Sequence, residues 1–221
     1  MTIGALLFDL DGTLADTAPD LAAALNATLA AFGRPPLPYE RIRPVVSHGS
    51  VPLIQLGFGL DPGDPGFELR RRFLLDHYRA HICDGTRLFP GMDKVLCDLA
   101  ARKVPWGVVT NKPAWLTDPL LERLPLPSSP AVVVSGDTCP QRKPHPMPLH
   151  HACDRLGVET PRAVYVGDAR RDLEAGRAAG MATVLAGWGY IDPAEEPETW
   201  PADHRCDDPE ALLTALFLTP G

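Results

Sequence analysis

The chain has 221 residues, of which 45% are hydrophobic and 22% charged, and its formal net charge is −7. This length suits one large domain or one domain with an insertion, and the composition is that of a globular protein. The acidic balance, with no block of lysine and arginine, argues against nucleic acid or an anionic membrane surface as a partner.

The first predicted element is a buried strand that ends in two carboxylates. The apolar run from Ile3 to Phe8 has the length and composition of such a strand, and Asp9 and Asp11 follow it directly. Alternate residues of a strand point the same way, so burying this pair without a counter-charge is costly. An acidic turn also repels a pyrophosphate, which argues against a dinucleotide site. We therefore expect a cation at this end of the strand.

A helical block follows this strand. Helices are predicted over residues 18–32, 39–46, 52–56 and 68–81, with loops at 47–50 and 57–66. No alternating strand pattern occurs between residues 16 and 87. We therefore expect an inserted, all-helical cap domain at residues 17–87, called the helical insert below, and an α/β core made of residues 1–16 and 88–221.

After the insert, strands and helices alternate. Strands are predicted at residues 104–110, 131–135, 163–167 and 182–186, and helices at 92–103, 115–124, 147–156, 173–179 and 209–217. Such alternation implies parallel strands with right-handed crossovers. The predicted fold class is α/β, with a Rossmann-like, doubly wound parallel sheet.

Polar side chains follow four of these strands, and the carboxyl ends of parallel strands meet at one sheet edge. The residues concerned are Asp9, Asp11, Thr110, Asn111, Lys143, Asp168 and Asp172. Like charges about 4 Å apart cost on the order of 4 kcal/mol per pair at an effective dielectric near 20, so four carboxylates here require a divalent cation. An all-oxygen ligand set favours Mg²⁺ over zinc. Hydroxyl, amide and ammonium groups beside it suit phosphoryl transfer.

Four segments resemble, in order, the four motifs of the haloacid dehalogenase superfamily of phosphatases. They are Asp9-Leu10-Asp11-Gly12-Thr13, Val109-Thr110-Asn111-Lys112-Pro113, Arg142-Lys143-Pro144-His145-Pro146 and Gly167-Asp168-Ala169-Arg170-Arg171-Asp172. The helical insert resembles that family's cap of the four-helix type. The second and third motifs resemble the phosphoglycolate phosphatase branch. The tail from Gly189 to Trp200 is similar to the branch that acts on N-acetylmuramic acid 6-phosphate.

The resemblance implies a role for each motif. Asp9 is the nucleophile and forms an aspartyl phosphate, and Asp11 protonates the leaving oxygen and then deprotonates water. Mg²⁺ is held by the Asp9 carboxylate, the Asp11 backbone carbonyl and Asp168, with Asp172 nearby. Two further contacts complete the implied site: Thr110 and Asn111 bind the phosphoryl oxygens, and Lys143 offsets charge on Asp9 and on the phosphate.

The two substrates named by these branches share a carboxylate, which a charged donor from the insert would read. Arg43 and His48, at the small-residue loop 47–50, are the candidates, and two solvated side chains are the alternative. A β-phosphoglucomutase-like sugar-phosphate phosphotransferase is the alternative function, because it would use the same motifs. A dehalogenase is disfavoured because it lacks the residue at Asp11, and intact Asp9 and Asp11 argue against a non-catalytic module.

Several other residues leave two interpretations open. Asp16 caps the first helix of the insert or marks a hinge, and Lys112 faces the substrate or forms an outward ion pair. Arg170 and Arg171 are expected to be solvated. His77 and His81 have a metal-compatible spacing on a helix, but no third ligand is nearby, so a packed or solvated face is favoured.

The partner predicted from the whole sequence is a small-molecule phosphate ester, and the oligomeric state stays open. No run approaches the roughly 18 apolar residues of a membrane span, and no basic-then-apolar leader occurs. The five cysteines are odd in number and lack Cys-Xaa-Xaa-Cys spacing, which favours reduced thiols. A cytoplasmic protein is expected.

Overall fold

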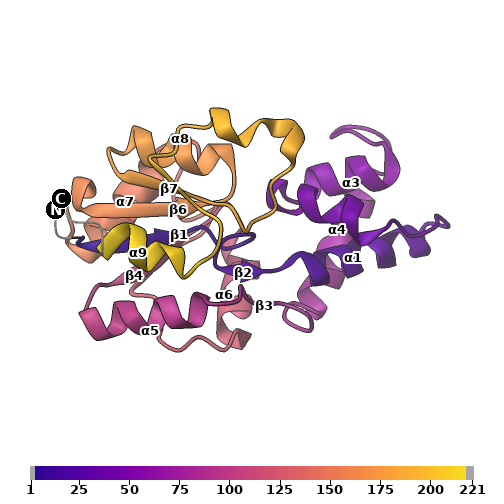
Figure 1. Cartoon of the computed structure of the whole chain (residues 1–221). Helices are drawn as coiled ribbons and strands as arrows, with labels where there is room; N and C mark the ends of the chain where they lie inside the picture. Colours follow the sequence, from indigo (N-terminus) through magenta and orange to yellow (C-terminus); the bar gives the residue numbers. More distant parts are fainter. Residues whose placement is uncertain (1–2, 218–221) are drawn as a thin grey trace.

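A computed structural model describes residues 3–217. Within that range, parallel strands form one sheet in the order β5-β4-β1-β6-β7-β8 (Figure 1). The strands are Val132–Val134 (β5), Trp106–Val109 (β4), Ala5–Phe8 (β1), Ala163–Gly167 (β6), Ala182–Ala186 (β7) and His204–Cys206 (β8). Five helices complete the α/β part: Met92–Arg102 (α5), Ala114–Arg123 (α6), Met147–Leu156 (α7), Arg170–Ala178 (α8) and Ala211–Phe217 (α9). The predicted doubly wound parallel sheet is confirmed.

The central strand β1 is buried on both faces, which explains its continuous apolar sequence. Leu6 and Phe8 belong to the apolar cluster that includes α5 and α9, whereas Ala5 and Leu7 belong to the cluster formed with α7 and α8. The strands β4 and β6 pair with β1 on either side, with Trp106 and Val164 beside Leu6. This register brings the carboxyl ends of the three strands to the same edge of the sheet. The sheet is therefore a rigid base for whatever lies at its carboxyl edge.

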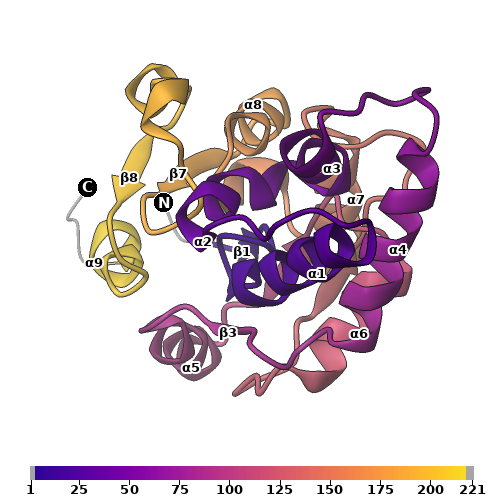
Figure 2. The ribbon, with the colours of Figure 1, turned by 90° about the vertical axis from the view of Figure 1, so that its right-hand side faces the viewer.

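The helical insert lies beyond that carboxyl edge (Figures 1 and 2). Its helices are Ala18–Ala31 (α1), Tyr39–Ile42 (α2), Ser50–Phe58 (α3) and Phe67–Ala80 (α4), with a 3₁₀ helix at Arg43–His48. The predicted helix over residues 39–46 therefore changes to 3₁₀ geometry at its second half, where Pro44 supplies no N–H. Apolar residues of α1, α3 and α4, among them Leu25, Leu53 and Leu74, are buried against one another.

Three short strands were not predicted. Ala15–Asp16 (β2) and Arg87–Leu88 (β3) form an antiparallel pair where the chain enters and leaves the insert. The third is β8 at the sheet edge, which pairs with β7. Each has two or three residues, too few to show a strand pattern in the sequence. None of the helices in the described part of the chain has the length and apolar character needed to cross a bilayer.

Candidate active site

The motif residues lie where three adjacent strands end side by side. Asp9 follows β1, Thr110 follows β4 and Asp168 follows β6. The ladder continues past the strand ends, because the Asp9 N–H donates to Val166 O and the Thr110 N–H donates to Val134 O, each at 2.9 Å. The fold therefore brings the first, second and fourth motifs to one edge.

Three buried carboxylates form a cluster at this edge. Asp9, Asp168 and Asp172 each offer an oxygen within 4.8 Å of the others, and none is more than 3% exposed. The carboxylate of Asp11 lies outside the cluster, where its Oδ1 accepts a hydrogen bond from the Thr17 hydroxyl at 2.7 Å. Three of the four predicted acids thus gather at one point, and the fourth has separate partners.

Burial and neighbouring carboxylates oppose the ionisation of Asp168 and Asp172. Burial, and then the neighbouring carboxylates of Asp172 and Asp9, raise the pKa of Asp168 to about 7. Burial also raises the pKa of Asp172, even with Lys143 beside it. An oxygen-only donor set of this kind fits a hard divalent cation such as Mg²⁺. The buried oxygens of the cluster are therefore suited to hold Mg²⁺.

Lys143 is the fixed cation of the cluster. Its fully buried ammonium lies 3.0 Å from Asp9 Oδ1 and 2.7 Å from Asp172 Oδ1, and it donates to the Tyr165 hydroxyl at 2.7 Å. The contact with Asp172 is an ion pair without hydrogen-bond alignment, so Oδ1 of Asp172 accepts no hydrogen bond within residues 3–217. Burial opposes ionisation of Asp9, but Lys143 and Arg171, with the hydrogen bond from the Leu10 N–H, together outweigh it and keep the pKa of Asp9 below its usual value.

The side chain of Asn111 is hydrogen-bonded to the loop that carries Lys143. Its side-chain amide donates to Lys143 O at 2.9 Å and accepts from the Lys143 N–H at 3.1 Å. This two-way clamp holds the loop that carries Lys143 against the end of β4. The side chain is therefore committed, and the backbone N–H of Asn111 and the hydroxyl of Thr110 are the groups left for phosphoryl oxygens.

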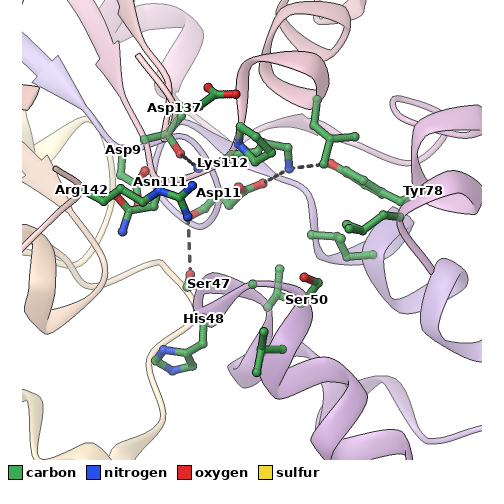
Figure 3. A pocket seen from close by; sticks show the side chains of 18 of the residues that line it. Asp9, Asp11, Ser47, His48, Ser50, Tyr78, Asn111, Lys112, Asp137 and Arg142 are labelled. Atoms are coloured by element: carbon green, nitrogen blue, oxygen red, sulfur yellow. Dashed lines mark hydrogen bonds and ion pairs between the residues drawn. The ribbon is translucent and has the colours of Figure 1, made fainter. Parts of the chain in front are cut away.

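A cavity of about 600 Å³ separates this edge from the helical insert. Figure 3 shows Ser47, Ser50 and Tyr78 of the insert opposite Asp9 and Asn111 of the core. Apolar side chains line part of the wall. The charged residues of the wall are the cations Arg71, Lys112, Arg142 and Arg171 and the carboxylates Asp9, Asp11 and Asp137. The wall therefore carries one more positive than negative side chain, and the cavity has room for more than a phosphate ion.

The insert touches the acid cluster through Ser47. The Ser47 hydroxyl lies 2.7 Å from Asp168 Oδ2 and 3.4 Å from the backbone carbonyl oxygen of Asp11. Arg171, on the first turn of α8, donates to Ser47 O at 2.6 Å. The expectation that Arg171 is solvated is therefore wrong, because it binds this loop at the cavity wall. Arg170 is exposed, as predicted, and pairs with Glu174.

Arg43 and His48, the two residues predicted to bind the substrate carboxylate, contact other groups of the protein. Arg43 donates to Trp188 O at 3.2 Å, and its guanidinium lies 4.9 Å from the centre of the Tyr190 ring. Arg43 is thus absent from the residues that line the cavity, and this prediction needs correction. His48 does line it, but its ring nitrogens face Glu195 at 2.9 Å and Arg171 at 3.5 Å. Helix spacing in the sequence does not show which way the arginine that begins a 3₁₀ helix will point.

Lys112 faces the site, not the solvent. Its ammonium donates to Asp11 Oδ1 and to the Tyr78 hydroxyl, both at 2.9 Å, and the side chain is 6% exposed. Burial acts to lower the pKa of Lys112, but Asp11 and Tyr78 outweigh it, so the pKa lies above its usual value. Burial raises the pKa of Tyr78 to about 12, so its hydroxyl keeps its proton at neutral pH.

Asp16, His77 and His81, which also had two interpretations, contact other side chains of the fold. Asp16 lies in β2 and accepts a hydrogen bond from the Tyr190 hydroxyl at 2.6 Å, which places it at the junction with the insert. The rings of His77 and His81 pack edge to face, 4.6 Å apart. Within residues 3–217, the three-aspartate cluster is the single group of three or more possible metal ligands. Tyr78 and Arg71 were not singled out from the sequence, since no local signal marks them, and Arg142 was noted there only as part of the third motif.

The chain was compared with known proteins. Residues 6–186 match the model of the haloacid dehalogenase-like hydrolase family. An N-acetylmuramic acid 6-phosphate phosphatase of Pseudomonas aeruginosa is 40% identical, over 98% of this chain and 96% of that protein. A phosphoglycolate phosphatase of Xylella fastidiosa is 43% identical, over 94% of this chain and 90% of that protein.

Solved structures agree with this assignment. A predicted phosphoglycolate phosphatase from Haemophilus somnus 129PT has a TM-score of 0.84 at 27% identity, covering 97% of this chain and 98% of that chain. CbbY from Rhodobacter sphaeroides, solved with phosphate, has a TM-score of 0.75 at 25% identity, covering 96% of both chains. The chain therefore belongs to the haloacid dehalogenase-like hydrolase family and is a phosphatase of that family.

Proposed function

We propose that the protein is a Mg²⁺-dependent phosphomonoesterase that works through an aspartyl phosphate on Asp9. The observation that carries this proposal is the buried cluster of Asp9, Asp168 and Asp172 beside Lys143. In this cluster Asp9 is an ionised carboxylate at the cavity wall. Asp168 has a raised pKa, and a bound divalent cation would favour its ionised form. This pairing of nucleophile and cation site suits attack on a phosphate ester.

The proposed reaction has two steps, each with Asp11 as acid or base. The Asp9 carboxylate attacks phosphorus, the ester P–O bond breaks, and the leaving oxygen takes a proton from the Asp11 carboxyl. Water then attacks the aspartyl phosphate and gives a proton back to Asp11, so Asp9 and inorganic phosphate are released. Oδ1 of Asp9 accepts a hydrogen bond from the Leu10 N–H at 2.8 Å and lies 3.0 Å from the Lys143 ammonium. The other oxygen is the one left to act as nucleophile.

Mg²⁺ would be held by the carboxylates of Asp9 and Asp168 and the backbone carbonyl of Asp11, with Asp172 nearby. When bound, it would offset charge on the transferring phosphoryl group. Lys143 offsets charge on Asp9 and on the phosphate, and the Thr110 hydroxyl with the Asn111 N–H binds phosphoryl oxygens. These contacts grow stronger as charge develops, which is the condition for faster reaction.

The helical insert, residues 17–87, closes the site from water. Its hinges are near residues 15–17, which include β2, and near residues 89–91, which follow β3 directly. The two strands pair with each other, with Ala15 opposite Leu88 and Asp16 opposite Arg87. Contacts of Ser47 with Asp168 and of Tyr78 with Lys112 would have to open for substrate to enter. The insert therefore belongs to the catalytic site and also shields it.

The substrate is a small carboxylated phosphomonoester, N-acetylmuramate 6-phosphate or 2-phosphoglycolate. The cavity of about 600 Å³ leaves room for a sugar as well as a phosphate, which favours the muramate. Phosphate release from a panel of phosphomonoesters, with and without Mg²⁺, tests this function. Isomerisation of a sugar phosphate that depends on a bisphosphate, with slow phosphate release, would contradict it and indicate the phosphotransferase.

Arg71, on α4, is the insert side chain best placed to read the substrate carboxylate. Its Nε donates to Ser50 Oγ at 3.0 Å and its Nη1 to Glu68 at 3.2 Å. Within residues 3–217 its Nη2 donates to no protein acceptor, and the side chain lines the cavity. A guanidinium fixed at one edge and open at the other suits a carboxylate.

Replacement of Arg71 by alanine is therefore expected to raise KM for N-acetylmuramate 6-phosphate by at least about tenfold, the effect of one charge-assisted hydrogen bond. The KM for p-nitrophenyl phosphate, which has no carboxylate, should stay within about threefold. Arg72→Ala is the matched control, since Arg72 is the next residue of α4 and is exposed. Equal increases of KM for both esters would contradict carboxylate reading by Arg71.

A further inference from the structure

Lys112 connects the helical insert to the acid–base residue Asp11. Its ammonium lies 2.9 Å from Asp11 Oδ1 and 2.9 Å from the hydroxyl of Tyr78, a fully buried residue of α4. The ammonium also lies 4.5 Å from the centre of the Tyr78 ring. Figure 3 shows this chain of contacts running from Tyr78 through Lys112 to Asp11. One side chain of the insert is therefore hydrogen-bonded, through one lysine, to the core.

The contacts of Asp11 are one-sided. Thr17 and Lys112 both donate to Oδ1, at 2.7 and 2.9 Å, and within residues 3–217 no protein group donates to Oδ2. The side chain is 16% exposed and lines the cavity. Two donors on one oxygen fix the rotation of the carboxyl group and leave the other oxygen for proton exchange.

We propose that Lys112 and Tyr78 are positioning residues that hold Asp11 in place for proton transfer to the leaving oxygen. This inference rests on the proposed phosphomonoesterase function. Proton transfer needs the acid within about 2.6–3.2 Å of its target, and an error of about 1 Å costs on the order of 10²-fold in rate. Because Tyr78 belongs to the insert, Asp11 reaches its working position only when the insert lies against the core.

A structural role of the pair, or binding of phosphate by Lys112, would affect all esters alike. The leaving group separates these cases. An alkyl ester such as N-acetylmuramate 6-phosphate expels a strongly basic alkoxide and needs the proton, whereas p-nitrophenyl phosphate expels a stable phenolate. The ratio kcat/KM covers the steps up to departure of the leaving group, so later hydrolysis of the aspartyl phosphate does not obscure the comparison.

The experiment compares Lys112→Met, Tyr78→Phe and the double variant on both esters. We expect Lys112→Met to lower kcat/KM about 10²-fold for the alkyl ester and by no more than about threefold for the aryl ester. Tyr78→Phe keeps the buried ring and should lower kcat/KM for the alkyl ester about tenfold. The double variant should be no worse than Lys112→Met alone, because both replacements break one chain of contacts.

Lys94→Met is the control, because it breaks a lysine–carboxylate pair of the same length, 2.9 Å, that is exposed and distant from the site. Equal losses on both esters, or losses that multiply in the double variant, would overturn the positioning role. If Lys112→Met does not fold, Tyr78→Phe decides the question: a larger loss of kcat/KM for the alkyl ester than for the aryl ester supports the positioning role, and equal losses overturn it. Hydrolysis of the aryl ester by the wild type and its loss in Asp9→Asn test the proposed function separately.

Discussion

Asparagine in place of Asp9 is expected to abolish turnover, with kcat at least about 10⁴-fold lower, while the protein keeps its fold. The replacement removes the nucleophilic charge without changing the shape of the side chain. Its amide oxygen can still accept the Leu10 N–H, and Lys143 keeps its ion pair with Asp172. Phosphate release from p-nitrophenyl phosphate measures the loss, and thermal unfolding shows whether the fold is retained.

Asp11→Asn provides the comparison. Loss of an acid–base group lowers rates by about 10²–10⁴-fold, so this variant should retain more activity than Asp9→Asn on an ester with a good leaving group. Mass spectrometry of the quenched reaction should find phosphate on Asp9 in the wild type and none in Asp9→Asn. Retention of a tenth of the wild-type rate by Asp9→Asn would mean that another nucleophile, such as water, attacks phosphorus.

The parts of the site predictable from sequence are those that the sheet positions. An apolar run followed by carboxylates predicts Asp9 at the end of a buried strand, and parallel strands bring their carboxyl ends together wherever the intervening helices lie. The position of Asp168 follows from the pairing of β6 with every residue of β1. For these residues a local pattern and one rule of topology were sufficient.

Side chains that depend on packing of the insert against the core were not predictable. Arg43 and Arg71 are both arginines of predicted helices, yet one packs on Tyr190 and the other lines the cavity. The difference arises from the 3₁₀ turn after Ile42 and from contacts with residues about 145 positions away. Lys112 likewise had two open interpretations until Tyr78, from another element, was placed beside it. Long-range contacts of this kind leave no periodic signal in the sequence.

Removal of the divalent cation is expected to abolish activity and to reduce stability in a pH-dependent way. Chelation should lower kcat by at least about 10³-fold, and Mg²⁺ should restore it. Ca²⁺ should restore little, because its larger and looser coordination shell misplaces the nucleophile. Full activity in excess chelator would contradict the metal assignment.

The direction of the pH effect follows from Asp168. In the folded, metal-free protein its pKa is raised from 3.8 to about 7, so the folded state holds a proton that the unfolded state has lost. The stabilising contribution of that proton is complete below about pH 3.8 and disappears as the pH rises through about 7. The pKa of Asp172 is raised too, which acts in the same direction. The pKa of Asp9 is lowered in the folded state, so its contribution to stability is already complete above pH 3.8. Asp9 therefore does not change the free energy of unfolding between pH 5.5 and 8.

Mg²⁺ competes with these protons for the same oxygens, so its stabilising effect should grow with pH. We expect the rise in Tm on adding Mg²⁺ to be larger at pH 8 than at pH 5.5 by at least about 5 °C. Comparing Tm with and without the metal at each pH cancels titrations elsewhere in the chain. Asp168→Asn keeps the shape of the side chain but cannot exchange a proton for the metal, so it should lose most of this difference. An equal rise at both pH values in the wild type would show that Mg²⁺ binds away from Asp168.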